Sequence, residues 1–347
     1  MLIHRNSVGH IIHTPAKINL FFEITGQRDD GFHEVETLMT PISLYDTLEV
    51  RPNTDGTIRL RCCLTSAKTP EEVRQPETEK RSSRTETRTS NEVLPSDESN
   101  LVVRAVALLR ERAHVHAGVD IELTKRIPIA AGLGGGSSDA AAALVAANRL
   151  WMLQWSRDRL AEVAAELGSD VPFFLYGKAA VCRGRGEIIE PVDETLSCPV
   201  VVLRPPVGLP TAEVFAAYRS RKWSDNRSRK QSDNRSKNRS DEKRQDLAPL
   251  LQAFRQGQLE LVAKSLFNRL QPVAAELCPW IDRMAEGMEQ EEGVGHLMSG
   301  SGSCYFGLFP NMEQARQAAD RLEHEQLGSA YVVQMCPPSH LCETGDP

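Results

Sequence analysis

Residues 128–143 read PIAAGLGGGSSDAAAA, a glycine-rich loop that runs directly into an alanine-rich segment of helical composition. Glycine has no side chain, so its backbone can approach a ligand closely. A helix that begins near Ser137 directs its first amide groups and the positive end of its dipole toward the same point. The stretch is therefore typical of a phosphate-binding loop, although a tight strand-to-helix turn without a ligand has a similar composition.

The loop differs from two common nucleotide-binding motifs. Gly136 is followed by Ser137 and Ser138 with no lysine, which excludes a Walker A loop, and the glycine spacing does not match the dinucleotide fingerprint G-x-G-x-x-G. A different phosphate-binding fold is therefore expected.

Composition limits the class of protein. The chain has 347 residues, which favours two domains plus insertions over one core, and 40% hydrophobic with 25% charged residues is typical of a globular protein. A net charge of -6 argues against nucleic acid as the main partner and favours a small molecule. No apolar stretch reaches the length of a membrane span or a signal-peptide core, so we expect a cytoplasmic protein without a membrane partner. Eight cysteines without C-x-x-C spacing predict neither a zinc site nor a disulfide framework, and no metal-ligating set of side chains is predicted.

The pattern before the loop predicts strands separated by a turn and followed by a helix. Apolar residues alternate over 18–24, further strands are expected at 34–39 and 46–51, and the polar cluster 28–31 predicts the turn between the first two. Residues 100–114 have helical spacing, and 118–129 predict a strand that leads into the loop. Strand, loop and helix in this order are what a phosphate site needs.

The pattern after the loop predicts an α+β second half. Helices are expected at 137–151 and 156–167, the latter closed by Gly168 as a C-cap, and Asp170 before Pro172 has the pattern of a helix cap. Further strands are expected at 179–183, 200–204 and 305–309, and further helices near 258–268, 274–287 and 313–327. A second glycine segment, residues 298–304 (MSGSGSC), precedes the strand at 305–309 and is compatible with a plain β-turn.

Two segments have the composition of insertions. Residues 65–99 contain much Glu, Arg, Ser, Thr and Pro and almost no large apolar residues, which predicts a disordered or loosely held insertion. Residues 221–244 contain the near-repeats SDNRSRK and SDNRSKN, which predict a basic low-complexity linker.

Three segments together carry a resemblance to a known superfamily. Residues 15–20 (PAKINL), 128–138 and 295–305 with its GSGS core resemble, in order and spacing, the three motifs of the GHMP kinases, which include galactokinase, homoserine kinase and mevalonate kinase. Residues 25–33 (TGQRDDGFH) and 168–173 (GSDVPF) are similar to one branch, the family of 4-diphosphocytidyl-2-C-methyl-D-erythritol kinases.

The resemblance implies a two-domain α+β fold and an activity. We expect an N-terminal ribosomal-protein-S5-like domain over 1–196, a C-terminal ferredoxin-like domain over 197–347, and an active site between them. The family transfers the γ-phosphoryl group of ATP to the 2-hydroxyl of the methylerythritol moiety, in the non-mevalonate route to isoprenoid precursors. Mg²⁺ is expected as the counter-ion of ATP.

Residue by residue, the resemblance also implies a site. Lys17 and Asp170 match the catalytic pair. The ATP loop is matched by Pro128, Ile129, Ala130, Ala131, Gly132, Leu133, Gly134, Gly135, Gly136, Ser137 and Ser138. Substrate-binding positions are matched by Asn19, Phe32, His33, Thr211 and Phe215.

The residue types suit these roles. Asp170 would accept the proton of the attacking hydroxyl, and Lys17 would orient it and keep it ionised. The amides of 134–138 and the hydroxyls of Ser137 and Ser138 would bind phosphate or the metal shell. His33 can present a donor and an acceptor to a pyrimidine edge, between aromatic rings that stack the base. Taken alone, Lys17 is also compatible with a solvated strand-end lysine, and His33 with a polar turn residue.

Two other functions fit parts of the sequence. The first is another GHMP kinase of the homoserine or mevalonate type, against which the pair Phe32 and His33 argues. The second is a non-catalytic RNA-binding module, suggested by the S5-like fold and the basic linker. The negative net charge and the joint presence of Lys17, Asp170 and the glycine loop favour an enzyme.

Overall fold

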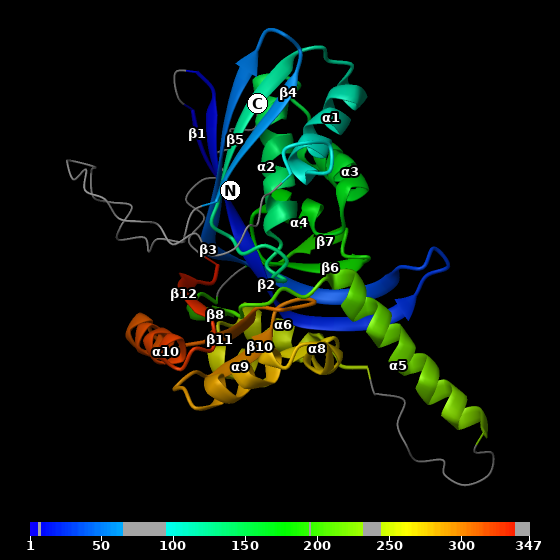
Figure 1. Ribbon diagram of the computed structural model, residues 1–347, viewed down its shortest axis with the longest axis vertical. Helices are drawn as coiled ribbons and strands as arrows, with labels where there is room; N and C mark the ends of the chain where they lie inside the picture. Colours follow the sequence, from blue (N-terminus) through cyan, green and yellow to red (C-terminus); the bar gives the residue numbers. More distant parts are fainter. Residues whose placement is uncertain (6–7, 65–94, 194–195, 232–243, 337–347) are drawn as a thin grey trace.

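The computed structural model describes residues 1–5, 8–64, 95–193, 196–231 and 244–336 (Figure 1). Most of the predicted insertion 65–99 and residues 232–243 of the predicted insertion 221–244 lie outside the described ranges. Within these ranges, no helix is long and apolar enough to cross a membrane.

Two β-sheets organise the described part of the chain, which confirms the predicted α+β class. The first has the strand order β1-β2-β3-β5-β4, with β6, β7 and β9 attached beside this path. Its strands are β1 (Leu2–Arg5), β2 (His10–Gln27), β3 (His33–Asn53), β4 (Ile58–Leu64), β5 (Gly118–Lys125), β6 (Ala180–Gly184), β7 (Ile188–Pro191) and β9 (Phe267–Asn268). The second is antiparallel, with the order β10 (Gly295–Met298), β11 (Tyr305–Leu308), β8 (Pro199–Arg204) and β12 (Ser329–Gln334).

A long hairpin of β2 and β3 forms the centre of the first sheet. The two strands pair from His10 opposite Val50 to Gln27 opposite His33, and the predicted turn at 28–31 joins them. The expectation of two separate strands at 34–39 and 46–51 was wrong, because both lie in β3. The pairing of β3 with β2 changes register where Pro15 lies opposite Tyr45 and Ala16 lies opposite Ile42. This irregularity lets β3 continue as one strand between the two predicted ones.

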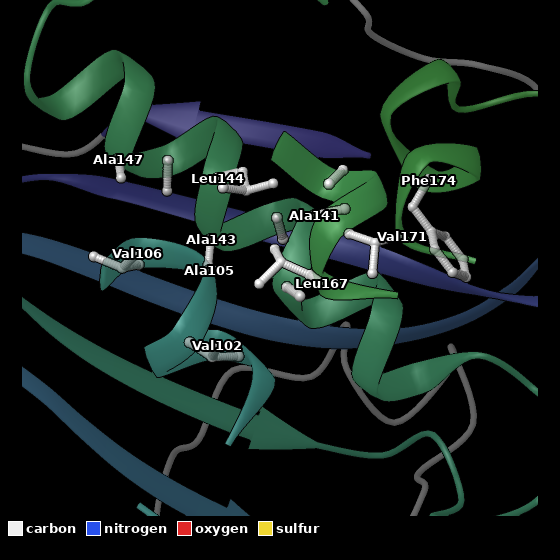
Figure 2. Close-up of a cluster of buried hydrophobic side chains, with 14 of the residues drawn as sticks. Val102, Ala105, Val106, Ala141, Ala143, Leu144, Ala147, Leu167, Val171 and Phe174 are labelled. Atoms are coloured by element: carbon white, nitrogen blue, oxygen red, sulfur yellow. The ribbon is translucent and has the colours of Figure 1, made fainter. Parts of the chain in front are cut away.

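The first sheet is covered by the helices α1 (Leu101–Ala113), α2 (Gly135–Leu150), α3 (Arg157–Leu167) and α4 (Val171–Tyr176). The α2 helix begins two residues before the predicted Ser137, and its alanines are almost fully buried. Figure 2 shows Ala141 and Ala143 of α2 among Val102 and Ala105 of α1 and Val171 of α4. Alanine has a short side chain, so the neighbouring helices can approach α2 closely.

Caps fix the ends of these helices. Asn100 accepts a hydrogen bond from the Val102 amide at the start of α1, and Ser156 accepts one from the Arg159 amide at the start of α3. Gly168 follows α3 as predicted, but its φ of 174° is extended backbone, so it is not a left-handed cap.

The second sheet and its junction with the first are accompanied by the helices α5 (Thr211–Gln231), α6 (Ala248–Arg255), α7 (Leu259–Lys264), α8 (Gln271–Leu277), α9 (Trp280–Glu289) and α10 (Met312–His324). The helix predicted at 258–268 ends at Lys264, because Phe267 and Asn268 pair with β2. The helix predicted at 274–287 is instead two helices, α8 and α9, separated at Cys278 and Pro279, since proline interrupts a helix.

The first part of the segment 221–244, which was predicted as a basic linker, is helical. The backbone continues as helix α5 to Gln231, and this helix projects from the body of the protein in Figure 1. Arg, Lys and Gln have good helix propensity, which favours this extension over an irregular linker.

The two sheets share a core. Ile18 and Leu20 of β2 belong to the same buried cluster as Val200 of β8 and Phe306 of β11. Ala131 and Leu133 of the glycine loop and Cys304 of the second glycine segment belong to the same cluster, so this shared core brings the two glycine segments together.

Candidate active site

A cavity of about 820 Å³ brings together most of the predicted site residues. It is lined by Lys17, Asn19, Phe32, His33, Pro128, Ile129, Ala130, Ala131, Gly132, Gly134, Gly135, Gly136, Ser137, Asp170, Thr211 and Phe215 among others. Two predicted residues, Leu133 and Ser138, do not line it. Ser138 is buried and its hydroxyl donates to the carbonyl oxygen of Pro15 at 2.6 Å, so this hydroxyl is committed to the protein.

Lys17 and Asp170 form an ion pair in this cavity. The Lys17 Nζ lies 3.6 Å from the Asp170 Oδ2 and donates to Asn19 Oδ1 at 2.6 Å and to the Gly132 carbonyl oxygen at 2.8 Å. Lys17 is buried, whereas the Asp170 side chain is 36% exposed. Burial lowers the pKa of Lys17, and the Asp170 carboxylate opposes this effect. Lys17 is therefore not a solvated strand-end lysine.

Asp170 stands before the first residue of α4, at the position expected for a cap. In the described structure its side chain makes no capping hydrogen bond, and its carboxylate is directed to Lys17. The local pattern that favours a cap is therefore overridden by a contact between residues 153 positions apart in the sequence.

The glycine loop needs glycine at two of its positions. Gly132 has φ +74° and a Cβ there would lie 2.1 Å from the Ser299 carbonyl oxygen, while Gly134 has φ +71° and a Cβ there would lie 2.8 Å from Phe174. Gly134 is also the N-cap of α2, so the first amides of α2 open toward the cavity. The loop therefore combines a close backbone approach with a helix N-terminus, as a phosphate site requires.

The second glycine segment is part of the same site and not an isolated β-turn. The Cys304 amide donates to the Ala131 carbonyl oxygen, and the Ser299 hydroxyl donates to the Gly132 carbonyl oxygen. Gly300 and Ser301 line the cavity, and the Ser301 hydroxyl lies 2.8 Å from that of Thr211 at the start of α5.

At the other end of the cavity, the predicted aromatic cluster is only partly assembled. The ring centroids of His33 and Phe215 are 5.1 Å apart, and His33 is buried. Phe32 is 51% exposed, and the Arg185 guanidinium lies over its ring at 5.0 Å from the centroid.

Sequence reasoning missed a buried charge cluster beside the loop. The Lys125 Nζ donates to Asp139 at 2.8 Å and also to Asp46, whose other oxygen accepts the amides of Arg126 and Ile127. Burial acts to lower the pKa of Lys125, but Asp139 and Asp46 outweigh it and raise that pKa. Burial raises the pKa of Asp139 well above its ordinary value. The signal that could have revealed this cluster is a single carboxylate inside an alanine-rich helix.

Asn268 is a second residue that the sequence did not reveal. Its amide nitrogen donates to the carbonyl oxygens of Met298 and Gly300 at 2.8 and 2.7 Å, so it fixes the second glycine segment. It lies in the short strand β9, which no local pattern predicted.

Comparison with known proteins agrees with this geometry. The GHMP kinases N terminal domain model matches residues 100–178, and the GHMP kinases C terminal model matches residues 250–327. A 4-diphosphocytidyl-2-C-methyl-D-erythritol kinase of Pelotomaculum thermopropionicum is 38% identical over 309 residues, which cover 88% of this chain and 91% of the relative. The chain belongs to the 4-diphosphocytidyl-2-C-methyl-D-erythritol kinase family.

Other members and neighbours support the same assignment. The kinase of this family from Shouchella clausii is 34% identical over 335 residues, covering 96% of this chain and 97% of the relative. A crystal structure of a 4-(cytidine 5'-diphospho)-2C-methyl-D-erythritol kinase superposes with a TM-score of 0.67 at 31% identity, covering 94% of this chain and 99% of that one. A homoserine kinase from Cytophaga hutchinsonii has a TM-score of 0.66 at 17% identity over 96% of both chains, which shows the shared fold alone.

Proposed function

We propose that this protein is the ATP-dependent kinase that phosphorylates the 2-hydroxyl of 4-diphosphocytidyl-2-C-methyl-D-erythritol. The observation that carries the proposal is one cavity in which the pair Lys17 and Asp170 lies between a phosphate-binding loop and a cluster of rings. Family membership supports the reaction, and the arrangement of the cavity supports the assignment of its residues.

The phosphates of ATP bind at the start of α2. The amides of Gly135, Gly136 and Ser137 open this helix at the cavity and are suited to phosphate oxygens. A Cβ at Gly134 would approach Lys17, whereas one at Gly135 would approach the Lys125 ammonium at 3.0 Å. The catalytic pair and the buried charge cluster thus flank the loop, and the reacting phosphate points toward Lys17 and Asp170.

Asp170 accepts the proton of the attacking hydroxyl. Its carboxylate is partly exposed in the cavity, whereas Lys17 is buried and held by Asn19 and Gly132. In the loose transition state of phosphoryl transfer the proton can move late, so the position of the base matters more than its strength.

Mg²⁺ enters with ATP in this proposal. Within the described residues no group of three or more His, Cys, Asp or Glu side chains forms a metal cage. Mg²⁺ commonly uses substrate phosphates and only one or two protein oxygens, and Ser137 and Asp170 offer such oxygens in the cavity. When bound, the ion neutralises charge on the triphosphate.

The cytosine of the substrate binds at Phe32, His33 and Phe215. His33 lies against the Phe215 ring, so an imidazole and an aromatic face line the same end of the cavity. Asn19, which accepts a hydrogen bond from Lys17, and Thr211, next to Ser301, also line the cavity.

The division into domains remains a proposal at 1–196 and 197–347, with the catalytic cavity between the two parts. The two matched family segments lie on either side of this boundary, although β9 from the second part pairs with β2 in the first. We also propose a cytoplasmic location, because ATP and a cytidine-diphosphate alcohol are metabolites of that compartment.

Coupled measurement of ADP release tests the proposed function. We expect ADP release from ATP to depend on 4-diphosphocytidyl-2-C-methyl-D-erythritol and not on homoserine or mevalonate. ADP release that responds equally to homoserine or mevalonate would refute the proposal.

A further inference from the structure

The proposed substrate places a diphosphate between its two recognised ends. On the proposed function, on which this inference rests, cytosine binds near Phe32 and the reacting hydroxyl lies at Asp170. The diphosphate that joins them carries negative charge, and a pocket that removes it from water needs a compensating cation.

Four cationic residues line the cavity within the described ranges: Lys17, Lys125, Arg185 and Arg219. Lys17 is buried against Asp170, Asn19 and Gly132, and Lys125 is buried between two aspartates. The ammonium groups of both lysines are thus directed to protein acceptors. The two arginines are the remaining described sources of positive charge along the cavity.

Arg185 stands between the two ends of the substrate site. It belongs to the turn that joins β6 and β7, and the next residue, Gly186, is so close to the catalytic base that a Cβ there would lie 3.7 Å from Asp170 Oδ1. The guanidinium at the end of the Arg185 side chain lies over the Phe32 ring. One side chain therefore reaches from the neighbourhood of the reacting hydroxyl to the base-binding end.

The remaining contacts of Arg185 are long and leave its guanidinium able to take a new partner. Its Nη2 donates to the Ala165 carbonyl oxygen at 3.3 Å, and its Nε lies 3.6 Å from Glu187 Oε1. The Glu187 carboxylate is held more closely by the Arg185 amide, at 2.6 Å. Arginine has five N–H donors in a planar fork that suits two phosphate oxygens at once.

Arg219 is placed differently. It lies on α5 and donates to the carbonyl oxygen of Gly31 at 3.4 Å, so it connects α5 to the turn between β2 and β3. Both guanidinium groups lie at the base-binding end, but of the two residues Arg185 is the one whose turn also lies beside Asp170, through Gly186. Arg185 is thus the better placed of the two for the diphosphate.

We propose that Arg185 binds the diphosphate of the cytidine-diphosphate alcohol and thereby sets the distance between the base and the reacting hydroxyl. In this role it is a positioning residue that distinguishes diphosphate-linked alcohols from free alcohols. Its stacking on Phe32 keeps the guanidinium at the base-binding end, where the diphosphate follows the nucleoside.

Calorimetric titration of two probes into the full-length protein tests this role. Cytidine and CDP are titrated into the wild type, Arg185→Met and Arg185→Lys, with a non-hydrolysable ATP analogue present to fill the ATP side of the cavity. We expect Arg185→Met to weaken CDP binding about tenfold or more and cytidine binding less than about twofold, with Arg185→Lys in between, because lysine keeps the charge but not the fork. The KM for the alcohol should rise while the KM for ATP stays unchanged.

Arg183→Gln is the matched control, since Arg183 lies on the same hairpin but pairs with Glu36 and Glu190 outside the cavity. Equal weakening of cytidine and CDP in Arg185→Met would show that Arg185 acts only through the Phe32 ring, and unchanged CDP binding would show no role; either result overturns the proposal. Turnover of the wild type with the whole substrate is a separate test. A wild type that binds CDP through Arg185 but does not phosphorylate the alcohol contradicts the proposed function alone, whereas one that binds neither probe contradicts both.

Discussion

The Lys17 ammonium lies 3.6 Å from the Asp170 carboxylate, although the two residues come from a strand of one hairpin and from the start of a short helix. Lys17 is buried and held by two further oxygen acceptors, whereas Asp170 faces the cavity. We propose that this asymmetry separates the roles of the two residues: Lys17 holds Asp170 in position, and Asp170 meets the substrate.

The pair should therefore lose activity as a unit. Lys17→Ala and Asp170→Ala should each lower kcat by about two to four orders of magnitude, and the double variant should be little worse than either. Steady-state kinetics of the three variants measure this coupling. Strictly multiplicative losses would show that the two residues act independently.

The glycine at 134 should be needed for folding as well as for binding. Gly134→Ala forces a side chain into φ +71° and against Phe174, so we expect a fall in stability of about 1–3 kcal/mol and a higher KM for ATP. Gly136→Ala is the matched control, because its Cβ would meet only Leu101 at 3.7 Å. Thermal unfolding compares the two variants, and equal melting temperatures would argue against the strained loop.

The charge cluster should respond unequally to the loss of its two carboxylates. Asp46 accepts two backbone amides as well as Lys125, so Asp46→Asn should cost about 3–5 kcal/mol of unfolding free energy. Asp139→Asn should cost far less, because burial already favours the neutral form of Asp139. Denaturant unfolding of both variants at neutral pH measures the difference, and a larger loss in Asp139→Asn would contradict this assignment.

The raised pKa of Asp139 also predicts a pH dependence. A carboxyl whose folded-state pKa lies above its unfolded value stabilises the fold below the unfolded pKa, and this contribution is lost as pH rises through the folded pKa. The stability of the wild type relative to Asp139→Asn should therefore fall as pH rises from about 4, near the usual pKa of aspartate. Denaturation at a series of pH values tests this, and a relative stability that rises with pH would be the opposite of the expected result.

His33 should determine the preference of the enzyme for cytosine over uracil. Stacking accepts any base, so discrimination between cytosine and uracil must come from hydrogen bonds, and an unpaired buried group costs about 1–3 kcal/mol. His33→Ala should reduce the ratio of kcat/KM for the cytidine over the uridine substrate, while Phe32→Ala should weaken both alike. An unchanged ratio in His33→Ala would mean that another group reads the base.

Local patterns predicted the helices and the turn whose capping or turn residues lie within the element or next to it. The helix after Asn100, the helix after Ser156 and the turn at 28–31 all depend on caps and turn residues within a few positions, and the structure confirms them. The first glycine loop was predicted as a binding segment by resemblance, and it lines the same cavity as Gly300 and Ser301 of the second glycine segment.

Features that depend on tertiary contacts were not predictable in this way. β9 exists because Phe267 and Asn268 meet β2, and the register irregularity near Pro15 joins what the alternation separated into two strands. The pairing of Lys125 with Asp46 and Asp139 joins three distant segments, and the commitment of the Ser138 hydroxyl to Pro15 depends on how α2 packs on β2.

The site of phosphorylation on the product is the decisive measurement for the proposed reaction. After reaction of the wild type with ATP and 4-diphosphocytidyl-2-C-methyl-D-erythritol, phosphorus and carbon NMR of the product locate the new phosphate. We expect a phosphomonoester on the tertiary 2-hydroxyl carbon, formed at a rate that Asp170→Asn lowers by about two orders of magnitude or more. A phosphate on another hydroxyl would contradict the proposed reaction, and full activity in Asp170→Asn would contradict the role of the Lys17–Asp170 pair.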